Sequence, residues 1–269
     1  MSKTADIVGV LSGKGGVGKT MLVSNLALAA AARGSRVLAV DGDLGLSNLD
    51  LALGLVPDRT VADLLAGACS FEETIVEDPR GIHLLPAATA RSDLPSMGPS
   101  ELGRLLVPLF QARARYDLIL VDLGSGISST VLSLSAACDR LLLVATPDPT
   151  SLADAYAVVK VLCGLGLEGP IEVLINGVRG QSEAIAAHGR LRRVAQRFLQ
   201  TRLPLAGYVS KDARVAEAIK LQQPVVEAFP SARASHQIRK LAEALLARSW
   251  STAERPAIAA GPERTIHGP

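Results

Sequence analysis

Short apolar runs alternate with longer stretches of helical periodicity along almost the whole chain. Nearly continuous Val, Ile and Leu runs are typical of parallel strands covered on both faces. They predict strands at residues 7–11, 36–40, 82–85, 118–121, 141–145, 171–175 and 207–209. Helical periodicity predicts helices at residues 19–33, 61–66, 101–115, 129–137, 151–165, 183–201, 213–222 and 234–248. This alternation predicts an α/β fold, a doubly wound, mostly parallel sheet flanked by helices.

The pattern stops near residue 250. We find no internal repeat or linker in the 269 residues, so residues 1–249 are predicted to form a single domain. Residues 250–269 are rich in Pro and poor in apolar residues, which predicts a disordered tail. Thr60 with Asp63, and Ser151 with Asp154, have the spacing of capping boxes that open two of the helices.

Composition excludes several classes of protein. A formal net charge of +2 and an aromatic content of 3% argue against a broad nucleic-acid surface or a base-stacking platform. The sequence shows no secretion signal and no apolar run long enough to span a membrane. We therefore expect a cytoplasmic protein with reduced cysteines. Those cysteines, which form no C-x-x-C pair, are Cys69, Cys138 and Cys163.

A glycine-rich loop between the first strand and the first helix carries the main chemical signal. The sequence GKGGVGKT fits the phosphate-loop pattern G-x-x-x-x-G-K-[ST], and a chance glycine turn is the alternative. In such a loop backbone N–H groups bind phosphate oxygens, Lys19 reaches the β- and γ-phosphates, and the Thr20 hydroxyl ligates Mg²⁺. The predicted nucleotide-binding residues of this segment are Gly13, Lys14, Gly15, Gly16, Val17, Gly18, Lys19, Thr20 and Met21.

Polar residues at later strand ends complete the predicted site, because open α/β sheets bind ligands at the carboxyl ends of their strands. Thr20, Asp43 and Asp122 are assigned to Mg²⁺, with Asp43 also placed to orient the attacking water. Asp41 is expected to anchor the loop or join the metal shell. Asn176 has the donor and acceptor needed to read an adenine edge. The alternatives are caps or turns for the aspartates and a turn for Asn176.

Residues 14–20, KGGVGKT, resemble the deviant Walker A loop of the MinD/ParA family of ATPases. The resemblance implies an ATP-bound homodimer with slow hydrolysis of ATP to ADP. It further implies that Lys14 crosses the dimer interface to the phosphates of the other subunit, which makes Lys14, Lys19 and Asp43 the catalytic set. A solvated loop lysine is the alternative for Lys14.

Three further segments resemble the flagellar-number regulators of the FlhG/FleN branch, and the likeness covers about residues 5–248. They are DGDLGLSNLD at residues 41–50, DLGSGIS at 122–128 and TPDPTSLADAY at 146–156. The resemblance implies control of flagellar number or placement and of flagellar gene expression, through a transcription activator. It also implies a place for Asp148 near the ribose or the dimer interface.

The chain departs from this branch in three places. Such regulators activate a flagellar GTPase through an N-terminal extension, and here the first strand begins too early to leave room for one. A flagellar GTPase and the flagellar switch complex therefore remain open as partners. Residues 251–269 have no amphipathic pattern, and the apolar side of residues 234–248 is expected to pack on the sheet. Transient contact with the inner membrane or cell pole therefore stays an alternative. Ser210 stands where the branch usually has proline.

The same residues also allow other functions. A ParA- or MinD-type role in DNA segregation or division-site placement is the main alternative. A DNA-segregation ATPase would bind DNA through a basic helix, although nucleic acid is the less favoured partner. The arginines of that helix are Arg190, Arg192, Arg193, Arg197 and Arg202. We expect the apolar neighbours to face the core: Leu191, Val194, Ala195, Phe198 and Leu199. A metal-cluster scaffold lacks its C-x-x-C, and Asp43 argues against a binding protein that does not hydrolyse ATP.

Overall fold

Within the residues that the structure describes, eight strands form one sheet in the order β3-β4-β2-β5-β1-β6-β7-β8. All neighbours are parallel except β3 and β4, which are antiparallel at one edge. The predicted mostly parallel, doubly wound sheet is therefore confirmed. The strands are β1 Asp6–Ser12, β2 Val37–Gly42, β3 Val76–Asp78, β4 Ile82–Leu85, β5 Leu118–Ser125, β6 Arg140–Ala145, β7 Ile171–Val178 and β8 Leu205–Ser210.

The computed structural model describes residues 4–43, 48–87, 98–167 and 169–247. The domain boundary predicted at residue 249 and the tail predicted at residues 250–269 lie outside these ranges. The helices are α1 Lys19–Ala31, α2 Leu49–Leu53, α3 Val61–Leu65, α4 Phe71–Thr74, α5 Pro99–Ala112, α6 Ser129–Ala136, α7 Pro149–Gly164, α8 Gln181–Leu199, α9 Ala213–Lys220, α10 Val225–Ala228 and α11 Arg233–Ala247.

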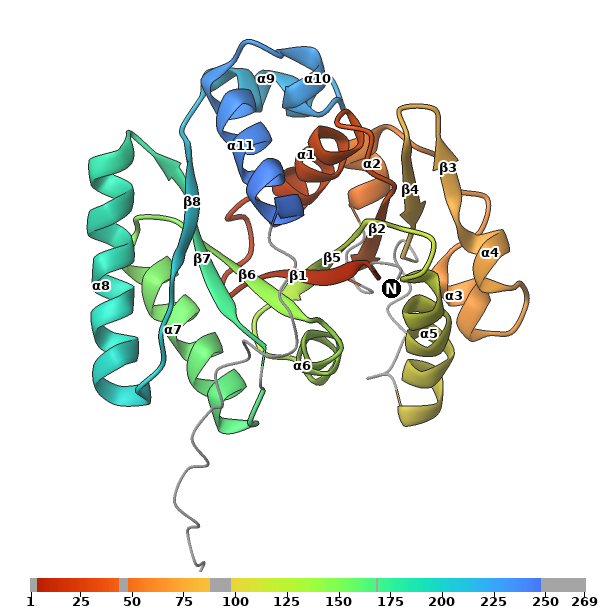
Figure 1. Ribbon diagram of the computed structural model, residues 1–269, viewed down its shortest axis with the longest axis horizontal. Coiled ribbons are helices and arrows are strands. Elements are labelled where there is room, and N and C mark those ends of the chain that lie inside the picture. Colours follow the sequence, from red (N-terminus) through yellow and green to blue (C-terminus); the bar gives the residue numbers. More distant parts are fainter. Residues whose placement is uncertain (1–3, 44–47, 88–97, 168, 248–269) are drawn as a thin grey trace, which may run out of the picture.

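Helices cover both faces of the sheet (Figure 1). One layer holds α1, α2, α9, α10 and α11, and the other holds α5, α6, α7 and α8. The central strands are buried along almost their full length, as their continuous apolar sequences predicted. The helix predicted at residues 234–248 packs its apolar side against α1 and β8, also as expected. No helix in the described ranges is both long and apolar enough to cross a membrane.

Two local predictions have different outcomes. The capping box at Thr60 and Asp63 is confirmed, because the Thr60 N–H donates to Asp63 Oδ2 over 2.8 Å. The box at Ser151 and Asp154 is wrong, because α7 begins two residues earlier at Pro149, with Asp148 as its N-cap residue. Proline is favoured at the first helical position, where no N–H is needed. The Ser151 hydroxyl instead accepts the Thr146 N–H over 3.0 Å.

The core face predicted for α8 is only partly right. Leu191 and Ala195 are buried and Leu199 is half-buried, as expected. Val194 and Phe198, by contrast, are 39% and 63% exposed. Helical spacing alone places them near the buried side, but α8 is an outer helix that buries only a narrow stripe. Val194 lies at the edge of that stripe, whereas Phe198, two turns after Leu191, shares its side of the helix but lies in the last turn of α8 and is exposed there.

Candidate nucleotide site

The phosphate loop joins the central strand β1 to α1 and lies at the carboxyl end of the sheet. β1 is bordered by β5 on one side and β6 on the other, the place where the strand order changes direction. Crevices at such a switch point are the usual ligand sites of open α/β sheets. The N-terminus of α1, with its unsatisfied N–H groups, points into the loop and favours an anion there.

The glycines of the phosphate loop are needed for two separate reasons, backbone conformation and close packing. Gly16 and Gly18 have φ angles of 76° and 97°, which glycine adopts without the strain a side chain adds. Gly13 is required by packing, because a Cβ there would lie 2.2 Å from the backbone carbon of Asp154 in α7. The loop is thus held between its own left-handed turns and α7. Asp154, expected at a helix cap, supplies that backbone contact instead.

The two lysines of the loop occupy different environments. Lys19 begins α1 and is only 9% exposed, at the position predicted for the phosphate-binding lysine. Lys14 is exposed, and its Nζ lies 3.5 Å from Thr150 Oγ1 in the first turn of α7. The Ser12 hydroxyl donates to the Lys14 carbonyl oxygen over 2.7 Å and fixes the backbone at that point. The Lys14 side chain therefore reaches the first turn of α7, whereas that of Lys19 is buried at the start of α1.

Asp41 binds the backbone on both sides of residues 44–47. Its Oδ1 accepts the Asp43 N–H over 3.0 Å, and its Oδ2 accepts the N–H groups of Asn48 and Leu49 over 3.3 and 3.2 Å. Asp41 thus anchors the segment that follows β2, while a part in the phosphate loop or the metal shell stays a prediction. The Asp43 carboxylate follows the end of β2 and lies against Gly124, where an added Cβ would come within 3.7 Å of Asp43 Oδ1.

Asp122 is the most deeply buried acid of the site, at 2% exposure. It is paired in register with Asp41 on the neighbouring strand. Burial is the main cause that raises the pKa of Asp122, to about 7. A hydrogen bond with Thr20 and the charge of Lys19 oppose this rise, while the charges of Asp41 and Asp43 add to it. The sequence placed Asp122 at the end of a strand, whereas β5 continues to Ser125.

The residues present fit a Mg²⁺ ion that is held in part by the nucleotide. Asp122 Oδ1 is buried and has no hydrogen-bond partner among the described residues, so it can accept from a metal-bound water. No three His, Cys, Asp or Glu side chains in the described ranges gather into a metal cage. Mg²⁺ commonly needs no such cage, because it takes one or two protein oxygens together with phosphate oxygens and water. Thr20, Asp43 and Asp122 offer that incomplete set.

Asn176, predicted to contact adenine, binds the loop itself. Its Nδ2 donates to the Val17 carbonyl oxygen over 2.8 Å, and its Oδ1 accepts the Gly177 N–H over 2.9 Å. One N–H and one lone pair remain on the amide for a base. Asp148 is exposed at the start of α7, and its Oδ2 accepts the Thr146 hydroxyl over 2.8 Å. The ligand roles of both residues stay predictions.

A mostly apolar pocket of about 280 Å³ adjoins the loop, and the sequence did not predict it. Its walls come from α1, α2, α9 and the segment before α10. They include the predicted Met21 beside Val215, Ile219 and Pro224. No sequence motif marks these residues, because they meet only through the packing of segments about 200 positions apart. The pocket offers the apolar surface that a nucleobase or its sugar needs next to a phosphate site.

These features define a class of protein. A central parallel sheet, a phosphate loop at its switch point, a buried lysine and converging aspartates form a P-loop nucleotide-binding protein.

The comparisons with known proteins narrow the class. The family model CbiA, described as the CobQ/CobB/MinD/ParA nucleotide binding domain, matches residues 8–225. The antiactivator FleN of Pseudomonas aeruginosa is 35% identical over 93% of this chain and 89% of its own length. The flagellum site-determining protein YlxH of Helicobacter pylori is 28% identical over 90% of this chain and 82% of its own. The septum site-determining protein MinD of Pyrococcus horikoshii, complexed with Mg-ADP, aligns with a TM-score of 0.75 and 28% identity, covering 89% and 95% of the two chains.

The chain belongs to the CobQ/CobB/MinD/ParA family of nucleotide-binding domains and is an ATPase of the MinD/ParA type. The resemblance noted in the sequence is therefore confirmed at family level, and so are the fold and the enzyme class that it implied.

Proposed function

We propose that the chain is an ATP-gated dimerising switch that regulates flagellar number or placement by restraining a flagellar transcription activator. Nucleotide and Mg²⁺ are its ligands, as the Mg-ADP complex of the related MinD supports. The flagellar part of the proposal is supported by the similarity to FleN, an antiactivator, and to YlxH, a flagellum site-determining protein. A single structural observation carries the switch, namely the separation of Lys14 from Lys19.

That separation has a physical consequence for dimerisation. Lys19, buried at the helix end, serves the phosphates of its own loop. Lys14 is exposed and lies beside Thr150, at the rim of the site, so it is free to meet phosphates presented by a second molecule. The affinity between two subunits then depends on the γ-phosphate charge that Lys14 offsets.

Hydrolysis needs a positioned water and neutralisation of charge. Asp43 orients water for in-line attack on the γ-phosphorus, and the bond to the β–γ bridging oxygen breaks to release ADP and phosphate. Lys19, the loop N–H groups and Lys14 of the opposite subunit stabilise the charge on the phosphoryl oxygens. Mg²⁺, which Thr20, Asp43 and Asp122 would hold, would supply further positive charge to the phosphates. Loss of the γ-phosphate removes a ligand of the segments around Asp43 and Asp122, and the dimer opens.

The test of the switch is the variant Lys14→Ala. We expect it to bind ATP with nearly unchanged affinity, because Lys19 and the loop N–H groups are intact, but to stay monomeric. Sedimentation velocity with a non-hydrolysable ATP analogue measures this directly. Lys160→Ala, an exposed lysine of α7 away from the loop, is the matched control and should dimerise normally. A Lys14→Ala protein that still dimerises would refute the role of Lys14 across the interface.

A second prediction concerns Asp43. Asp43→Ala should retain ATP binding and dimerise, because phosphate-loop contacts remain, while turnover falls by about 100-fold or more through loss of the water-orienting group. Phosphate release in single-turnover experiments and nucleotide titration separate the two effects. Normal turnover with impaired binding would reassign Asp43 to nucleotide affinity alone.

Division-site placement is a second candidate, supported by the similarity to septum site-determining MinD proteins. The two functions differ in cells that lack the gene. Altered flagellar number with normal septa supports the flagellar role, whereas misplaced septa with normal flagella would overturn it. The genes beside this one give an independent reading of the same choice.

A further inference from the structure

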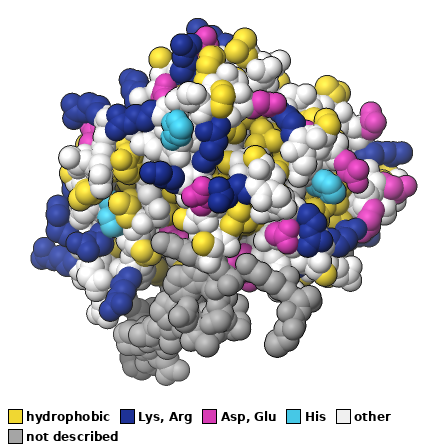
Figure 2. All heavy atoms as spheres, turned by 45° about the horizontal axis from the view of Figure 1, so that its top comes forward, with side chains coloured by type: hydrophobic (Ala, Val, Ile, Leu, Met, Phe, Trp, Pro, Cys, Tyr) yellow, Lys and Arg dark blue, Asp and Glu magenta, His cyan; other side chains and the backbone are white. Residues whose placement is uncertain are grey.

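Helix α8 carries an arginine ridge on its outer face, formed by Arg190, Arg193 and Arg197. Residues three and four positions apart lie on the same side of a helix, one turn above another. The opposite side of α8 is the buried one, with Ala187, Leu191 and Ala195 packed toward the rest of the protein. In Figure 1 α8 forms an outer edge of the molecule, and in Figure 2 Lys and Arg side chains gather at that edge.

Many arginines elsewhere in the protein are neutralised by ion pairs, whereas the ridge is not. Arg33, Arg36, Arg80, Arg113, Arg115, Arg140, Arg179 and Arg214 each pair with a carboxylate. Among the described residues, no such pair involves Arg190, Arg193 or Arg197. The sequence from residue 184 to 204 holds no Asp or Glu at all. Glu183, which pairs with Arg179, also interacts electrostatically with Arg190, but one carboxylate does not balance the charges of the ridge. The ridge therefore keeps an excess of positive charge, which favours an acidic partner.

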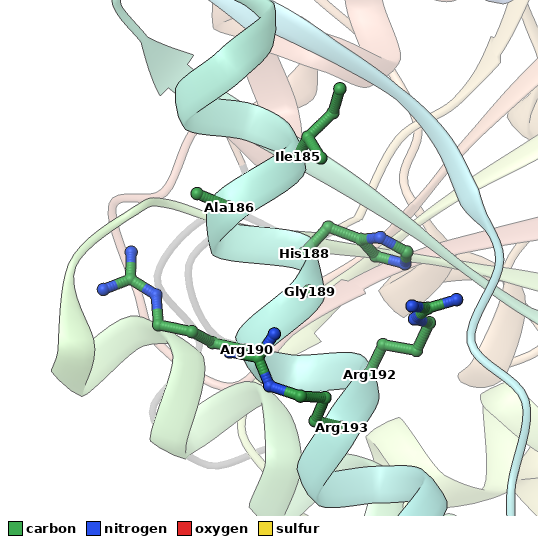
Figure 3. A pocket seen from close by; sticks show the side chains of 7 residues that line it. All are labelled: Ile185, Ala186, His188, Gly189, Arg190, Arg192 and Arg193. Atoms are coloured by element: carbon green, nitrogen blue, oxygen red, sulfur yellow. The ribbon is translucent and has the colours of Figure 1, made fainter.

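A hollow of about 670 Å³ lies along this part of α8 (Figure 3). Gly189 forms part of its lining, and the side chains of Arg190, Arg192 and Arg193 surround it. Glycine is a costly residue in the middle of a helix, and here it leaves room between guanidinium groups. His188 is not available to a ligand through Nε2, which contacts the Leu203 carbonyl oxygen over 2.7 Å. The hollow therefore offers guanidinium donors to an acidic side chain.

Large apolar side chains flank the ridge. Ile185, Val194 and Phe198 are 54%, 39% and 63% exposed, and the Arg197 guanidinium lies 5.2 Å from the centre of the Phe198 ring. At about 100° per residue, Ile185 and Val194 point to roughly opposite sides of the ridge. Arginine and phenylalanine on one exposed face are typical of the centres of protein–protein interfaces.

We propose that the outer face of α8 is the docking surface for an acidic, amphipathic helix of a partner protein. Its carboxylates lie on the arginine ridge, and its apolar residues cover Ile185, Val194 and Phe198. A bilayer fits less well, because the ridge stands between apolar side chains that could not enter it together. A nucleic acid uses the arginines but leaves the apolar flanks uncovered.

The surface adjoins the nucleotide site without being part of it. Arg190 Nη2 lies 3.5 Å from the Pro147 carbonyl oxygen, just before the turn in which Thr150 contacts Lys14. A partner docked on α8 therefore reaches the rim of the site. The α8 docking surface builds on the proposed switch, because it states which kind of partner the switch binds. Docking on α8 needs neither dimerisation nor ATP hydrolysis, so an experiment can refute the docking surface or the switch separately.

The test uses the full chain and a fluorescein-labelled synthetic helix with glutamates every third and fourth residue and leucines on both flanks. Fluorescence anisotropy should show binding that weakens as salt rises. Binding should weaken about tenfold in Arg190→Glu/Arg193→Glu/Arg197→Glu, because three exposed ion pairs are lost. Phe198→Ser should weaken it about threefold through lost apolar contact. Thermal melts and ATPase rates should be unchanged in both variants.

The control variant Arg59→Glu/Lys160→Glu/Lys240→Glu changes the net charge equally at exposed positions elsewhere, and should bind the helix normally. Equal weakening in this control, or no binding to the wild-type chain, would overturn the proposal. So would binding of polyglutamate as tight as that of the leucine-flanked helix, which would make α8 a solvated charged face. Tighter ridge-dependent binding to duplex DNA or to phosphatidylglycerol vesicles would assign the surface to a nucleic acid or a membrane instead.

Discussion

At Asp122 the demands of folding and of metal binding oppose each other. The carboxylate is almost fully buried in β5 beside Asp41, and burial raises its pKa to about 7. A buried ionised carboxylate is costly unless a cation or hydrogen bonds compensate it. Within the protein, a hydrogen bond with Thr20 and the charge of Lys19 favour the ionised form and so compensate part of this cost. Binding of Mg²⁺ favours the ionised form, so metal affinity should increase as pH rises through about 7.

The variant Asp122→Asn should stabilise the nucleotide-free protein in a pH-dependent way. The folded state holds the Asp122 proton up to about pH 7, whereas the unfolded chain releases it near 3.8. The raised pKa therefore contributes its whole stabilisation of the folded state below the pKa of the unfolded chain. This contribution is lost as pH rises toward and through the pKa of the folded state. Asn resembles the protonated form, so its advantage should grow between those limits and level off above about pH 7. At about 1.4 kcal/mol per tenfold change in proton affinity, the gain should reach a few kcal/mol.

Urea denaturation at a series of pH values measures this gain. Asp58→Asn, an exposed carboxylate away from the site, is the control and should change stability by less than about 0.5 kcal/mol. A stabilisation by Asp122→Asn that is the same at pH 5 and pH 8 would contradict the burial of a raised-pKa carboxylate.

Among the elements, the turn between β8 and α9 is joined to α11 by side chains. The Ser210 N–H donates to Gln237 Oε1 over 2.8 Å, and Gln237 Nε2 donates to Ser210 Oγ over 3.0 Å. Asp212, the N-cap of α9, also accepts the Ala234 N–H at the start of α11 over 3.2 Å. A proline at position 210, usual in the flagellar branch that the sequence resembles, has no N–H to give Gln237. Serine therefore permits a pairing that proline would prevent.

Gln237→Leu should cost more stability than Ser210→Ala. The first change leaves a buried N–H and a hydroxyl without partners, while the second removes one hydroxyl and leaves the N–H paired. We expect losses of about 1–3 kcal/mol and about 1 kcal/mol, measured by urea denaturation. Gln237→Glu, whose carboxylate still accepts from Ser210, is the conservative control. Losses of equal size for Gln237→Leu and Ser210→Ala would mean that the backbone hydrogen bond contributes nothing.

The long elements could be predicted from sequence, and most of the short ones could not. Continuous apolar runs placed seven strands because burial on both faces leaves a strong local pattern. The three-residue edge strand β3 and the short helices α2, α4 and α10 carry too few residues for a periodicity, and their packing decides them. The start of α7 was missed because Ser151 and Asp154 imitate a cap, while Pro149 sets the true first turn.

Across the whole molecule, the phosphate loop and its acidic partners were predictable because parallel strands bring their ends together. Asp41, Asp43 and Asp122 follow from that rule alone. Sequence could not predict the hydrogen bond between Asn176 and Val17 or the pocket beside Met21, because each joins distant segments that carry no motif. The same limit hid the exposure of Val194, at the edge of the narrow buried stripe of α8, and of Phe198, in the last turn of that helix.

Arg140, at the end of the sheet opposite the site, links three elements of the molecule. The side chain is 1% exposed, and its Nη2 donates to the Leu245 carbonyl oxygen at the end of α11 over 2.6 Å. Its guanidinium also lies 3.8 Å from Asp6 of β1 and 3.9 Å from the buried Glu172 of β7. One side chain thus holds the first strand, a later strand and the last described helix together.

Arg140→Ala should destabilise the protein by about 3–5 kcal/mol, because it leaves the Glu172 charge buried without its cation. Chemical denaturation measures the loss, and hydrogen exchange should show faster opening at the end of α11 than in the central strands. The pair Arg140→Met/Glu172→Gln, which removes both buried charges and keeps the volume, should recover most of the stability. If the double variant is as unstable as Arg140→Ala, the loss comes from the bond to Leu245 and not from the unpaired carboxylate. The protein would then depend on Arg140 to fasten α11, with the ion pair adding little.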